Sequence, residues 1–323
     1  SGTGDTYGLL IKNNIHNVTI KNCKFTNGML QNEQIGIKTE EISHNISYLN
    51  ITNNTIDING ELSSYGLYGI KLTSGDYSDI NNNNITLNNS DYGVYYSYSD
   101  NSSIKNNFIS GDYDNAIYLG YDENIEVINN NISLDGMSIS YGVQIYESNY
   151  TDVIGNDIDA SFAYSIMGYG QNGFGDIVQD NIIHGNGLRF HHVEDLTINQ
   201  SGIVKYLFEN IKFKIINDYG AINFFENFTG QRDNMDRDIL ISNNFVYVNG
   251  SLGENVSANI ELYDVRLNGT VSILKDNQPC ENCSNLTYSG GIYSFNVTGF
   301  SNYTLTSVPA SCGDTVYNTL YLN

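Results

Sequence analysis

The sequence predicts an all-β fold in which short strands wind into a solenoid of about nine stacked coils, followed by a small antiparallel β-sandwich. Three observations predict it: a glycine that recurs about every 26 residues, alternation of apolar and polar residues after each glycine, and the lack of helical spacing. The chain has 323 residues, of which 40% are apolar and 2 are Pro. It is therefore long and apolar enough to bury a sizeable core.

The recurring mark is a glycine followed by an aliphatic residue, often with tyrosine before it. Taken as equivalent, the marks fall at positions 8, 36, 69, 93, 116, 142, 165, 187 and 220. The next residues form an aliphatic column: Leu9, Ile37, Ile70, Val94, Ile117, Val143, Ile166, Leu188 and Ala221. A second column lies two residues further on: Ile11, Thr39, Leu72, Tyr96, Leu119, Ile145, Gly168, Phe190 and Asn223. This period of two predicts one half-buried strand in each coil.

A second pattern within each coil reads aliphatic, x, Asn, x, x, aliphatic. It occurs as Ile20-Asn22-Phe25, Ile51-Asn53-Ile56, Ile80-Asn82-Ile85, Val127-Asn129-Ile132 and Phe208-Asn210-Phe213. Ile104-Asn106-Phe108 is one residue short, and Ile198-Gln200-Ile203 competes with Phe208-Asn210-Phe213 for the same coil. Two strands and a turn per coil predict parallel pairing with the coils above and below. We expect the asparagines of the pattern to stack into a ladder of side-chain amides.

The segment from Ser1 to about Tyr247, roughly three quarters of the chain, resembles the right-handed parallel β-helix of the pectate-lyase-like class. The resemblance is closest to Asn-rich β-helices of archaeal secreted and surface proteins, on phrases such as NVTIKNCKF and YGLLIKN. It implies the fold and leaves the function open, because this scaffold carries lyases, hydrolases, epimerases, adhesins and structural fibres.

From about Val248 the pattern changes to alternating strands separated by turn signals at Asn268-Gly269 and Ser289-Gly290-Gly291. This segment also resembles the module that follows β-helices in archaeal surface proteins. We expect a β-helix over residues 1–247, an Ig-like β-sandwich over 248–308 and a C-terminal extension over 309–323. Cys280 and Cys283 are expected to form a structural disulfide across a tight turn, because neither a second zinc ligand pair nor a βαβ context is evident.

The tail SCGDTVYNTLYLN resembles the segment that precedes and caps the first coil in such β-helices, whereas the chain itself starts like a first coil without that cap. We expect the tail to add as a donor strand to the first coil of the next molecule, which gives a head-to-tail filament. The assembly residues would be Cys312, Gly313, Asp314, Val316, Leu320 and Leu322, with Cys312 paired to Cys23 of the neighbour. The alternative is one unit of a tandem array, capped within the same chain.

Charge and composition favour an extracellular location. The net charge of -22 disfavours binding to nucleic acid or to anionic lipid, and no run approaches the roughly 20 apolar residues of a membrane span. The chain holds 18 Asn-x-Ser/Thr triplets (sequons), where about 7 are expected by chance, and this excess predicts N-glycosylation. The asparagines are Asn17, Asn45, Asn50, Asn53, Asn84, Asn88, Asn101, Asn131, Asn149, Asn199, Asn227, Asn249, Asn255, Asn268, Asn282, Asn285, Asn296 and Asn302. We expect a secreted chain from which any signal peptide has been removed.

Catalysis is a minority interpretation. Arg189 and His191 alternate on one strand, but the alignment gives them Met167 and Tyr169 on one side and Ile222 and Phe224 on the other, with no flanking carboxylate. The acidic clusters, which are Asp112 with Asp114, Asp76 with Asp79, and Asp233, Asp236 and Asp238, are expected in turns. The last cluster has oxygen ligands for calcium but no recognised loop spacing. We expect no cofactor and no catalytic site, with a polysaccharide lyase or hydrolase as the alternative.

Four tyrosines, Tyr95, Tyr118, Tyr146 and Tyr169, are expected to face outward on adjacent coils. They could bind the faces of sugars, contact a neighbouring filament or only support the sheet. The sequence as a whole favours an extracellular structural protein whose partners are copies of itself and covalent N-glycans, with surface polysaccharide as a further partner. A glycan-binding adhesin is the other alternative.

Overall fold

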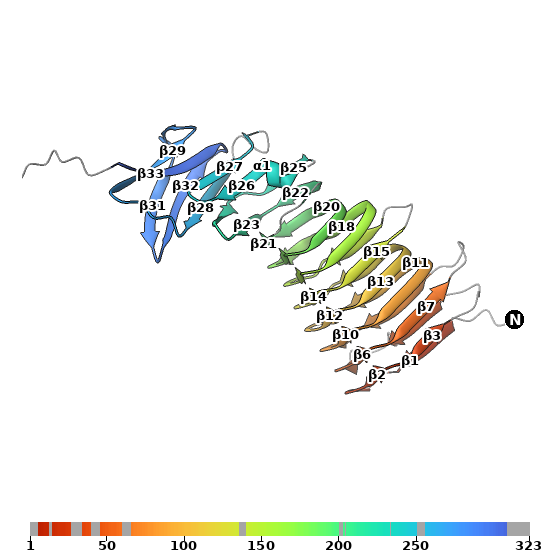
Figure 1. Cartoon of the computed structure of the whole chain (residues 1–323). Helices are drawn as coiled ribbons and strands as arrows, with labels where there is room; N and C mark the ends of the chain where they lie inside the picture. The colour runs from red at the N-terminus through yellow and green to blue at the C-terminus, as the bar shows by residue number, and fades with distance from the viewer. Residues whose placement is uncertain are drawn as a thin grey trace, which may run out of the picture. The chain divides into compact units, whose positions relative to one another are not determined.

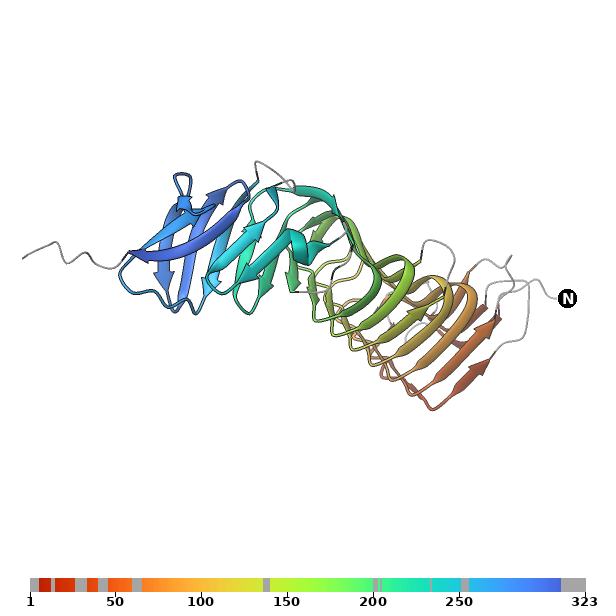
Figure 2. The same ribbon diagram turned by 45° about the horizontal axis from the view of Figure 1, so that its top comes forward.

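Each coil of the chain contains three short strands, and equivalent strands of successive coils pair in parallel (Figure 1). The computed structural model describes residues 6–12, 15–26, 34–39, 46–59, 66–135, 140–199, 203, 205–232, 234–250 and 256–308. The fold is all-β, with long parallel sheets, and Figure 2 shows the strands of successive coils stacked on one another. Within the described ranges, no helix is long and apolar enough to cross a membrane.

The strands of each coil are called first, second and third in chain order. The first strands lie in β1 (Thr6–Ile11), β4 (Gln34–Thr39), β8 (Leu67–Thr73), β11 (Asn84–Ser97), β13 (Phe108–Gly120), β16 (Tyr141–Tyr146), β18 (Asp157–Phe174), β20 (Ile182–Glu194) and β22 (Tyr206–Ile211). The second strands are β2 (Thr19–Lys21), β6 (Asn50–Thr52), β10 (Asp79–Asn81), β12 (Ser103–Lys105), β14 (Glu126–Ile128), β17 (Asp152–Ile154), β19 (Ile177–Gln179), β21 (Leu196–Asn199) and β23 (Phe213–Asn217). The third strands are β3 (Lys24–Thr26), β7 (Thr55–Asn59), β15 (Asn131–Leu134) and the first halves of β11, β13, β18 and β20.

The predicted aliphatic column is confirmed from the first coil to the eighth. Leu9 pairs with Ile37, and the register continues through each column member to Ile166 with Leu188. Ile37, Ile70, Val94, Ile117, Val143, Ile166 and Leu188 are fully buried. Parallel, in-register pairing therefore places each aliphatic side chain of this column against the aliphatic side chains of the coils on either side, and the column forms a ladder in the core.

The ninth member of the column was assigned wrongly. Leu188 pairs with Tyr206 and Phe190 with Phe208, whereas Ala221 lies in β24 (Gly220–Phe224), which is antiparallel to β28 (Ser257–Tyr263). The glycine mark explains the error. A Cβ at Gly187 would lie 2.2 Å from the carbonyl oxygen of Lys205 in the next parallel coil, and a Cβ at Gly220 would lie equally close to the carbonyl oxygen of Glu261 in the antiparallel strand β28, 2.2 Å away. The same glycine signal therefore arises in both settings, whereas the strand that lies beside β22 in the sheet is β25 (Phe228–Arg232), which is antiparallel.

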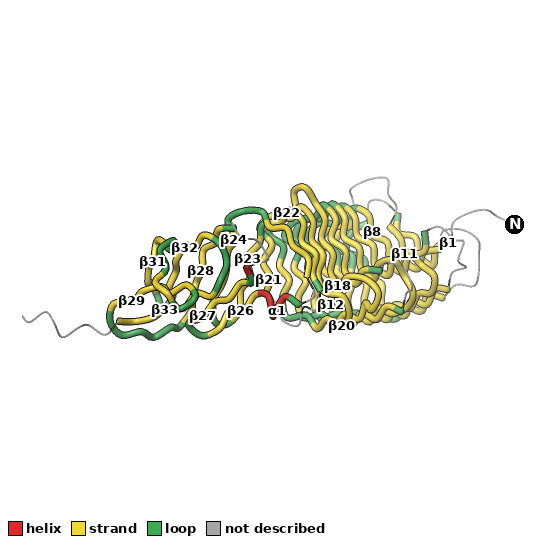
Figure 3. Tube along the Cα trace, turned by 90° about the horizontal axis from the view of Figure 1, so that it is seen from above, coloured by secondary structure: helices red, strands yellow, loops and turns green. Residues whose placement is uncertain are grey.

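Left-handed residues turn the chain at two corners of the central coils, two residues at the first corner and one at the second. At the first corner, between the first and second strands, Tyr98 and Tyr121 follow the first strand, and Tyr77 and Tyr150 lie three residues later in their own coils, just before the second strand, with φ between 52° and 61°. The second corner, between the second and third strands, includes Asn53, Asn82, Asn106 and Asn129, with φ between 53° and 56°. Asparagine tolerates this conformation, whereas tyrosine adopts it at a cost of about 1–2 kcal/mol. Figure 3 shows the resulting stack of coils from above.

The asparagine ladder exists, but one residue later than predicted. Its rungs are Asn54, Asn83, Asn107, Asn130, Asn156 and Asn181, each at most 5% exposed. Nδ2 of Asn83 donates to Oδ1 of Asn107 at 3.0 Å and to the carbonyl of Ile51 at 2.8 Å, and the other rungs repeat this arrangement. The left-handed asparagine points its own side chain outward and turns the next side chain inward. The predicted asparagines therefore make the corner and the following ones make the ladder.

Two register ambiguities are also resolved. Ile109, in the third strand of its coil, pairs with Ile85, so Ile109 and not Phe108 is the last aliphatic residue of the pattern that contains Asn106. Phe108 points outward and is 44% exposed. Ile198 pairs with Val178 in the second sheet, while Phe208 pairs with Phe190 in the first. The two segments that seemed to compete therefore belong to successive coils and to different strands.

The chain divides into two compact units, one of residues 1–216 and 226–237, the other of 217–225 and 238–323. The second unit takes in strands before residue 248, the boundary that the sequence suggests. Strands β24, β28, β32 (Ile292–Thr298) and β31 (Ser284–Ser289) pair antiparallel in that order. A separate antiparallel sheet contains β26 (Ile239–Ser242), β27 (Phe245–Val248), β33 (Asn302–Val308), β29 (Thr270–Lys275) and β30 (Gln278–Pro279). These antiparallel sheets fit the small sandwich. Helix α1 (Met235–Asp238) and the pair β5 (Ile46–Ser47) and β9 (Gly75–Asp76) complete the elements.

Candidate functional site

The four predicted tyrosines form two stacked pairs in two different columns. Tyr95 pairs with Tyr118, their rings 4.9 Å apart and 8° from parallel, but the next residue of that column is Gln144. Tyr146 pairs with Tyr169, their rings 5.4 Å apart and 13° from parallel, and lies in register with Gly120. The four tyrosines therefore lie on adjacent coils at half-buried positions, as expected, but in two outward columns that are two residues apart.

The stacking decides what these rings can bind. Rings that stack along the solenoid axis turn their faces to each other, so the faces are not free for a sugar ring. Tyr68 and Tyr92 stack in the same way, with Lys71 4.6 Å above the ring of Tyr68. Burial raises the pKa of Tyr92 to about 12, which keeps its hydroxyl neutral. This tyrosine surface therefore mainly supports the first sheet through cross-strand pairing.

Arg189 and His191 lie on β20 beside Met167 and Tyr169, as the alignment predicts. On their other side, however, are Leu207 and Glu209 rather than Ile222 and Phe224, so the prediction that no carboxylate flanks them was wrong. The error follows from the misplaced ninth coil.

The histidine of this cluster is fully engaged. Nε2 of His191 lies 3.4 Å from Oε2 of Glu209, and its Nδ1 lies 2.7 Å from Nδ1 of His192. Burial and the neighbouring His192 lower the pKa of His191, against the opposing charge of Glu209. The Arg189 guanidinium lies 6.0 Å from the ring centre of Tyr164. With both ring nitrogens occupied, His191 is poorly placed to take a proton from a substrate.

A groove of about 500 Å³ crosses five coils at their first corners. One wall is the outward column of the second strands, which carries Asp79, Ser103, Glu126, Asp152 and Ile177 in register. The other wall is formed by corner residues with positive φ: Asn101, Asn124, Tyr150 and Gly175. The sequence-based assignment of Asp79 to a turn was wrong, since it lies in β10 and faces this groove.

The groove exists because an aromatic column is interrupted. Tyr48 and Tyr77 stack at this corner with their ring centres 5.1 Å apart, and the next two coils carry Asn101 and Asn124 instead. The next aromatic side chain of this column is that of Tyr150, which is 51% exposed. Two short side chains thus leave unfilled the space that rings occupy in the flanking coils.

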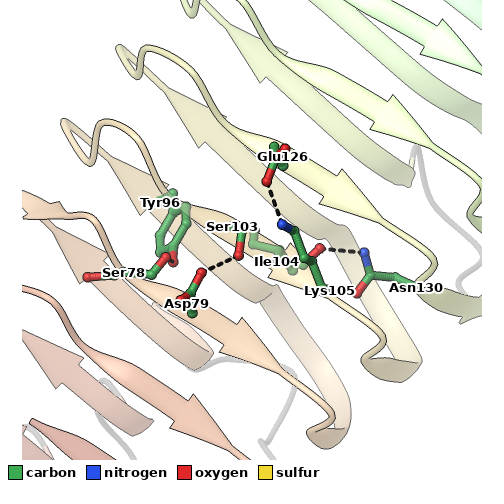
Figure 4. Close-up of polar contacts among 8 residues, drawn as sticks. All are labelled: Ser78, Asp79, Tyr96, Ser103, Ile104, Lys105, Glu126 and Asn130. Atoms are coloured by element: carbon green, nitrogen blue, oxygen red, sulfur yellow. Dashed lines mark hydrogen bonds and ion pairs between the residues drawn. The ribbon is translucent and has the colours of Figure 1, made fainter.

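The groove is acidic and rich in hydrogen-bond acceptors. The Ser103 hydroxyl donates to Asp79, and the Lys105 ammonium pairs with Glu126 (Figure 4). Burial, and to a smaller extent the charge of Glu126, raises the pKa of Asp152. Carboxylates in this arrangement accept hydrogen bonds from hydroxyl groups and repel anions. The alignment of second strands carried this signal, because acidic residues recur one position before the buried aliphatic residue.

Other acidic residues are spread among several elements. Asp112 and Asp114 lie in β13 and Asp76 in β9, so the expectation that they lie in turns was wrong for these three. Asp236 and Asp238 lie in α1, and Asp233 falls outside the described residues. Among the described residues, no group of three or more His, Cys, Asp or Glu is arranged to hold a metal ion.

The sequons follow the exposed surface. Of the sequon asparagines, Asn45 and Asn255 lie outside the described residues, and none of the others is buried. The exposed ones are Asn17, Asn53, Asn84, Asn88, Asn101, Asn131, Asn227, Asn268, Asn282 and Asn285. Asn50, Asn149, Asn199, Asn249, Asn296 and Asn302 are half-buried. By contrast, the six buried ladder asparagines all lie outside sequons.

The cysteines are of two kinds. Cys280 and Cys283 are joined by a disulfide, with their Cα atoms 5.5 Å apart. Cys23 is an exposed free thiol at the first position of the asparagine ladder, where its backbone N–H donates to Oδ1 of Asn54 at 2.9 Å. Cys312 and the other predicted assembly residues, Gly313, Asp314, Val316, Leu320 and Leu322, lie outside the described residues.

Parallel coils, buried amide ladders and in-register aliphatic columns define a β-helix. The family described as the right-handed β-helix region matches residues 3–172, which is more than half of the chain. The chain therefore belongs to the right-handed β-helix family, and its coils are right-handed. No curated protein matches the sequence. The family fixes the fold, and because β-helices serve many functions, the function has to be argued from this chain's own surface.

Proposed function

We propose that this chain is a structural part of an extracellular, N-glycosylated β-helix protein, and that it has no catalytic role. The distribution of asparagines carries the proposal. Every described sequon asparagine is exposed or half-buried, while the seven buried asparagines of the described residues, Asn115 and the six of the ladder, are outside sequons. N-linked sugars need an accessible amide, so this is the distribution that glycosylation requires.

The interior supports a structural role. Each ladder amide bonds to a neighbouring coil through both its nitrogen and its oxygen, and the inner columns consist mostly of aliphatic residues, with the fully buried rings of Tyr96, Phe190 and Phe208 among them. Networks in which every member is satisfied make a solenoid rigid. The engagement of both ring nitrogens of His191 supports the non-catalytic part of the proposal.

Site-resolved glycopeptide mass spectrometry of the protein purified from its native source tests the proposal. We expect sugar on several of the ten exposed sequons, and lower occupancy at half-buried Asn296, whose amide oxygen accepts a hydrogen bond from Asn259. Unmodified asparagine at every sequon would refute glycosylation and remove the main support for an extracellular location.

Head-to-tail assembly is a second candidate. Within the described residues, β1 pairs on one side only, with β4, and exposed Cys23 lies in the same coil. Strand addition at β1 by residues 311–323 of another copy would extend the parallel sheet. Negative-stain electron microscopy of the full chain beside a chain ending at Val308 tests it. Filaments from the full chain alone support strand donation, and single particles from both exclude it.

A further inference from the structure

One sequon asparagine lies in the wall of the groove. Asn101 has a φ of 54°, is exposed, and starts the sequon Asn101-Ser102-Ser103. Its Oδ1 accepts a hydrogen bond from Nδ2 of Asn124 at 3.3 Å, and no described residue accepts a hydrogen bond from its own Nδ2. That nitrogen is the atom to which an N-linked sugar is attached.

We propose that the groove is the binding site for the first sugars of a glycan attached to Asn101. The inference rests on the proposed glycosylation and assigns this groove to the chain's own glycan. Among the residues that line the groove, Asn101 is the sequon asparagine, and its exposed side chain lies in the groove wall.

The size and polarity of the groove fit this occupant. Its volume of about 500 Å³ falls within the range of roughly 300–1,000 Å³ typical of small-molecule sites. Asp79, Glu126 and Asp152 can accept hydrogen bonds from sugar hydroxyls, and the half-exposed ring of Tyr150 can contact their C–H groups. Three carboxylates with Lys105 as the paired cation repel uronic or sulfated sugars, so the proximal sugars are uncharged hexoses or N-acetylhexosamines.

The attachment itself requires a separate transferase and a glycosyl diphosphate donor. Nδ2 of Asn101 attacks C1 of the donated sugar and forms the N–C1 bond, and one Nδ2 proton passes to a base of the transferase. The C1–O bond to the diphosphate breaks, and the leaving group departs with its electron pair. The groove residues take no part in this step, and they act on the attached product.

Asn53 offers a matched comparison. It is also a sequon asparagine with positive φ, 53°, and an exposed side chain, but it lies at the second corner and does not line the groove. Differences between the two sites therefore report the groove and not the local backbone.

The test is timed release by a peptide N-glycosidase under native conditions, followed site by site with glycopeptide mass spectrometry on protein from a glycosylating secretory host. We expect release from Asn101 to be about tenfold slower than from Asn53, the factor that ~1.4 kcal/mol of groove contact gives. Equal rates overturn the proposal. A bare Asn101 beside occupied exposed sequons also overturns it and leaves the proposed function standing, whereas bare sequons throughout defeat both.

Filling the groove gives a second test. Asn124→Tyr places at this corner the residue that Tyr77 and Tyr150 already supply in the same backbone conformation, so it should fold. It should raise the rate at Asn101 to that at Asn53. Asn22→Tyr makes the same change at φ 56° outside the groove and should leave the slow rate unchanged. Fast release in both variants, or in neither, contradicts the assignment. Binding of free mannohexaose to the groove of a chain bare at Asn101 would identify an external saccharide as the occupant instead.

Discussion

The buried asparagines bind neighbouring coils through both ends of their amides. Asn107 donates from Nδ2 to Oδ1 of Asn130 at 3.0 Å and to the carbonyl of Ile80 at 2.9 Å, and it accepts from Asn83. Asn107→Ala leaves these partners buried without hydrogen bonds, and each such group costs about 1–3 kcal/mol. We expect urea denaturation to show a loss of about 3–5 kcal/mol in the free energy of unfolding.

The outward neighbour provides the control for that change. Asn106 has a φ of 56° and an exposed side chain, so Asn106→Gly keeps a residue that tolerates the left-handed conformation. It should change the stability by less than about 1 kcal/mol. Equal losses from the two variants would mean that the corner, and not the ladder, holds the coils together.

A buried carboxyl group should make stability depend on pH. Asp176 is 1% exposed, its Oδ1 accepts from the N–H of Thr151 at 2.9 Å, and no described residue bonds its Oδ2. Burial raises its pKa to about 7. An unfolded Asp has a pKa of about 3.9, so between about pH 4 and pH 7 the folded chain holds the proton more tightly than the unfolded chain does. The free energy of unfolding therefore falls as pH rises through this window, by up to about 4 kcal/mol.

Asp176→Asn should remove the part of that dependence that Asp176 contributes, while the part from Asp122, whose pKa burial raises to about 8, remains. Its amide oxygen can keep the bond to Thr151, so the variant should match the parent near pH 4.5 and exceed it in stability near pH 8, as urea denaturation at the two pH values can measure. Asp180→Asn changes an exposed residue of the same coil and should leave the dependence intact. A parent chain that is equally stable at both pH values would contradict the argument.

The corner asparagines show why the sequence predicted the correct structures, a turn and an amide ladder, but assigned the ladder to the wrong residue of each pair. The repeated asparagine correctly indicated a turn and a ladder, because asparagine suits both. Which of two adjacent residues points inward depends on the left-handed φ of the first. In pairs such as Asn53-Asn54 and Asn82-Asn83 both residues are asparagine, so the sequence does not distinguish the corner residue from the ladder residue. The groove was missed for a related reason, since it comes from two asparagines where other coils carry tyrosine.

At the level of the strand, the recurring glycine records the close approach of neighbouring coils. A Cβ on Gly93 would lie 2.6 Å from the carbonyl oxygen of Ala116 and 2.8 Å from Cγ2 of Ile109. Both neighbours belong to packed strands and have little room to move. Glycine therefore marks most of the close approaches between coils, although Ala116 and Ser165 occupy the same column and Gly220 makes an equally close approach within an antiparallel pair.

Gly93→Ala should test this packing constraint. Overpacking of this kind costs about 1–3 kcal/mol, so we expect a loss of about 2 kcal/mol in the free energy of unfolding by urea denaturation. Ala116→Gly in the same column removes a methyl group without a clash and should cost at most about 1 kcal/mol. A harmless Gly93→Ala would show that the coils can separate locally to admit a side chain.

Across the whole molecule, the sequence correctly predicts that a β-helix precedes a unit of antiparallel strands, but it predicts the boundary between the two less well. The second unit includes β24, which precedes residues 226–237 of the first unit in the chain. A single boundary in the sequence cannot describe two units when the chain passes from the first to the second, back to the first and again to the second. The aliphatic pattern around Gly220 also continued the repeat by chance and concealed the change of sheet.

The interleaving predicts how fragments of the second unit behave. A fragment of residues 248–308 lacks β24, β26 and most of β27, so β28 loses its antiparallel partner from Gly220 to Phe224, and β33 loses the partner that pairs Phe245 with Thr304. Unpaired edges of this kind aggregate. Residues 217–308 keep all of these strands. We expect dispersed amide NMR signals and cooperative urea unfolding from the longer fragment, and poorly dispersed signals or precipitation from the shorter one. Two equally well-folded fragments would place the true unit within residues 248–308, as the sequence alone suggests.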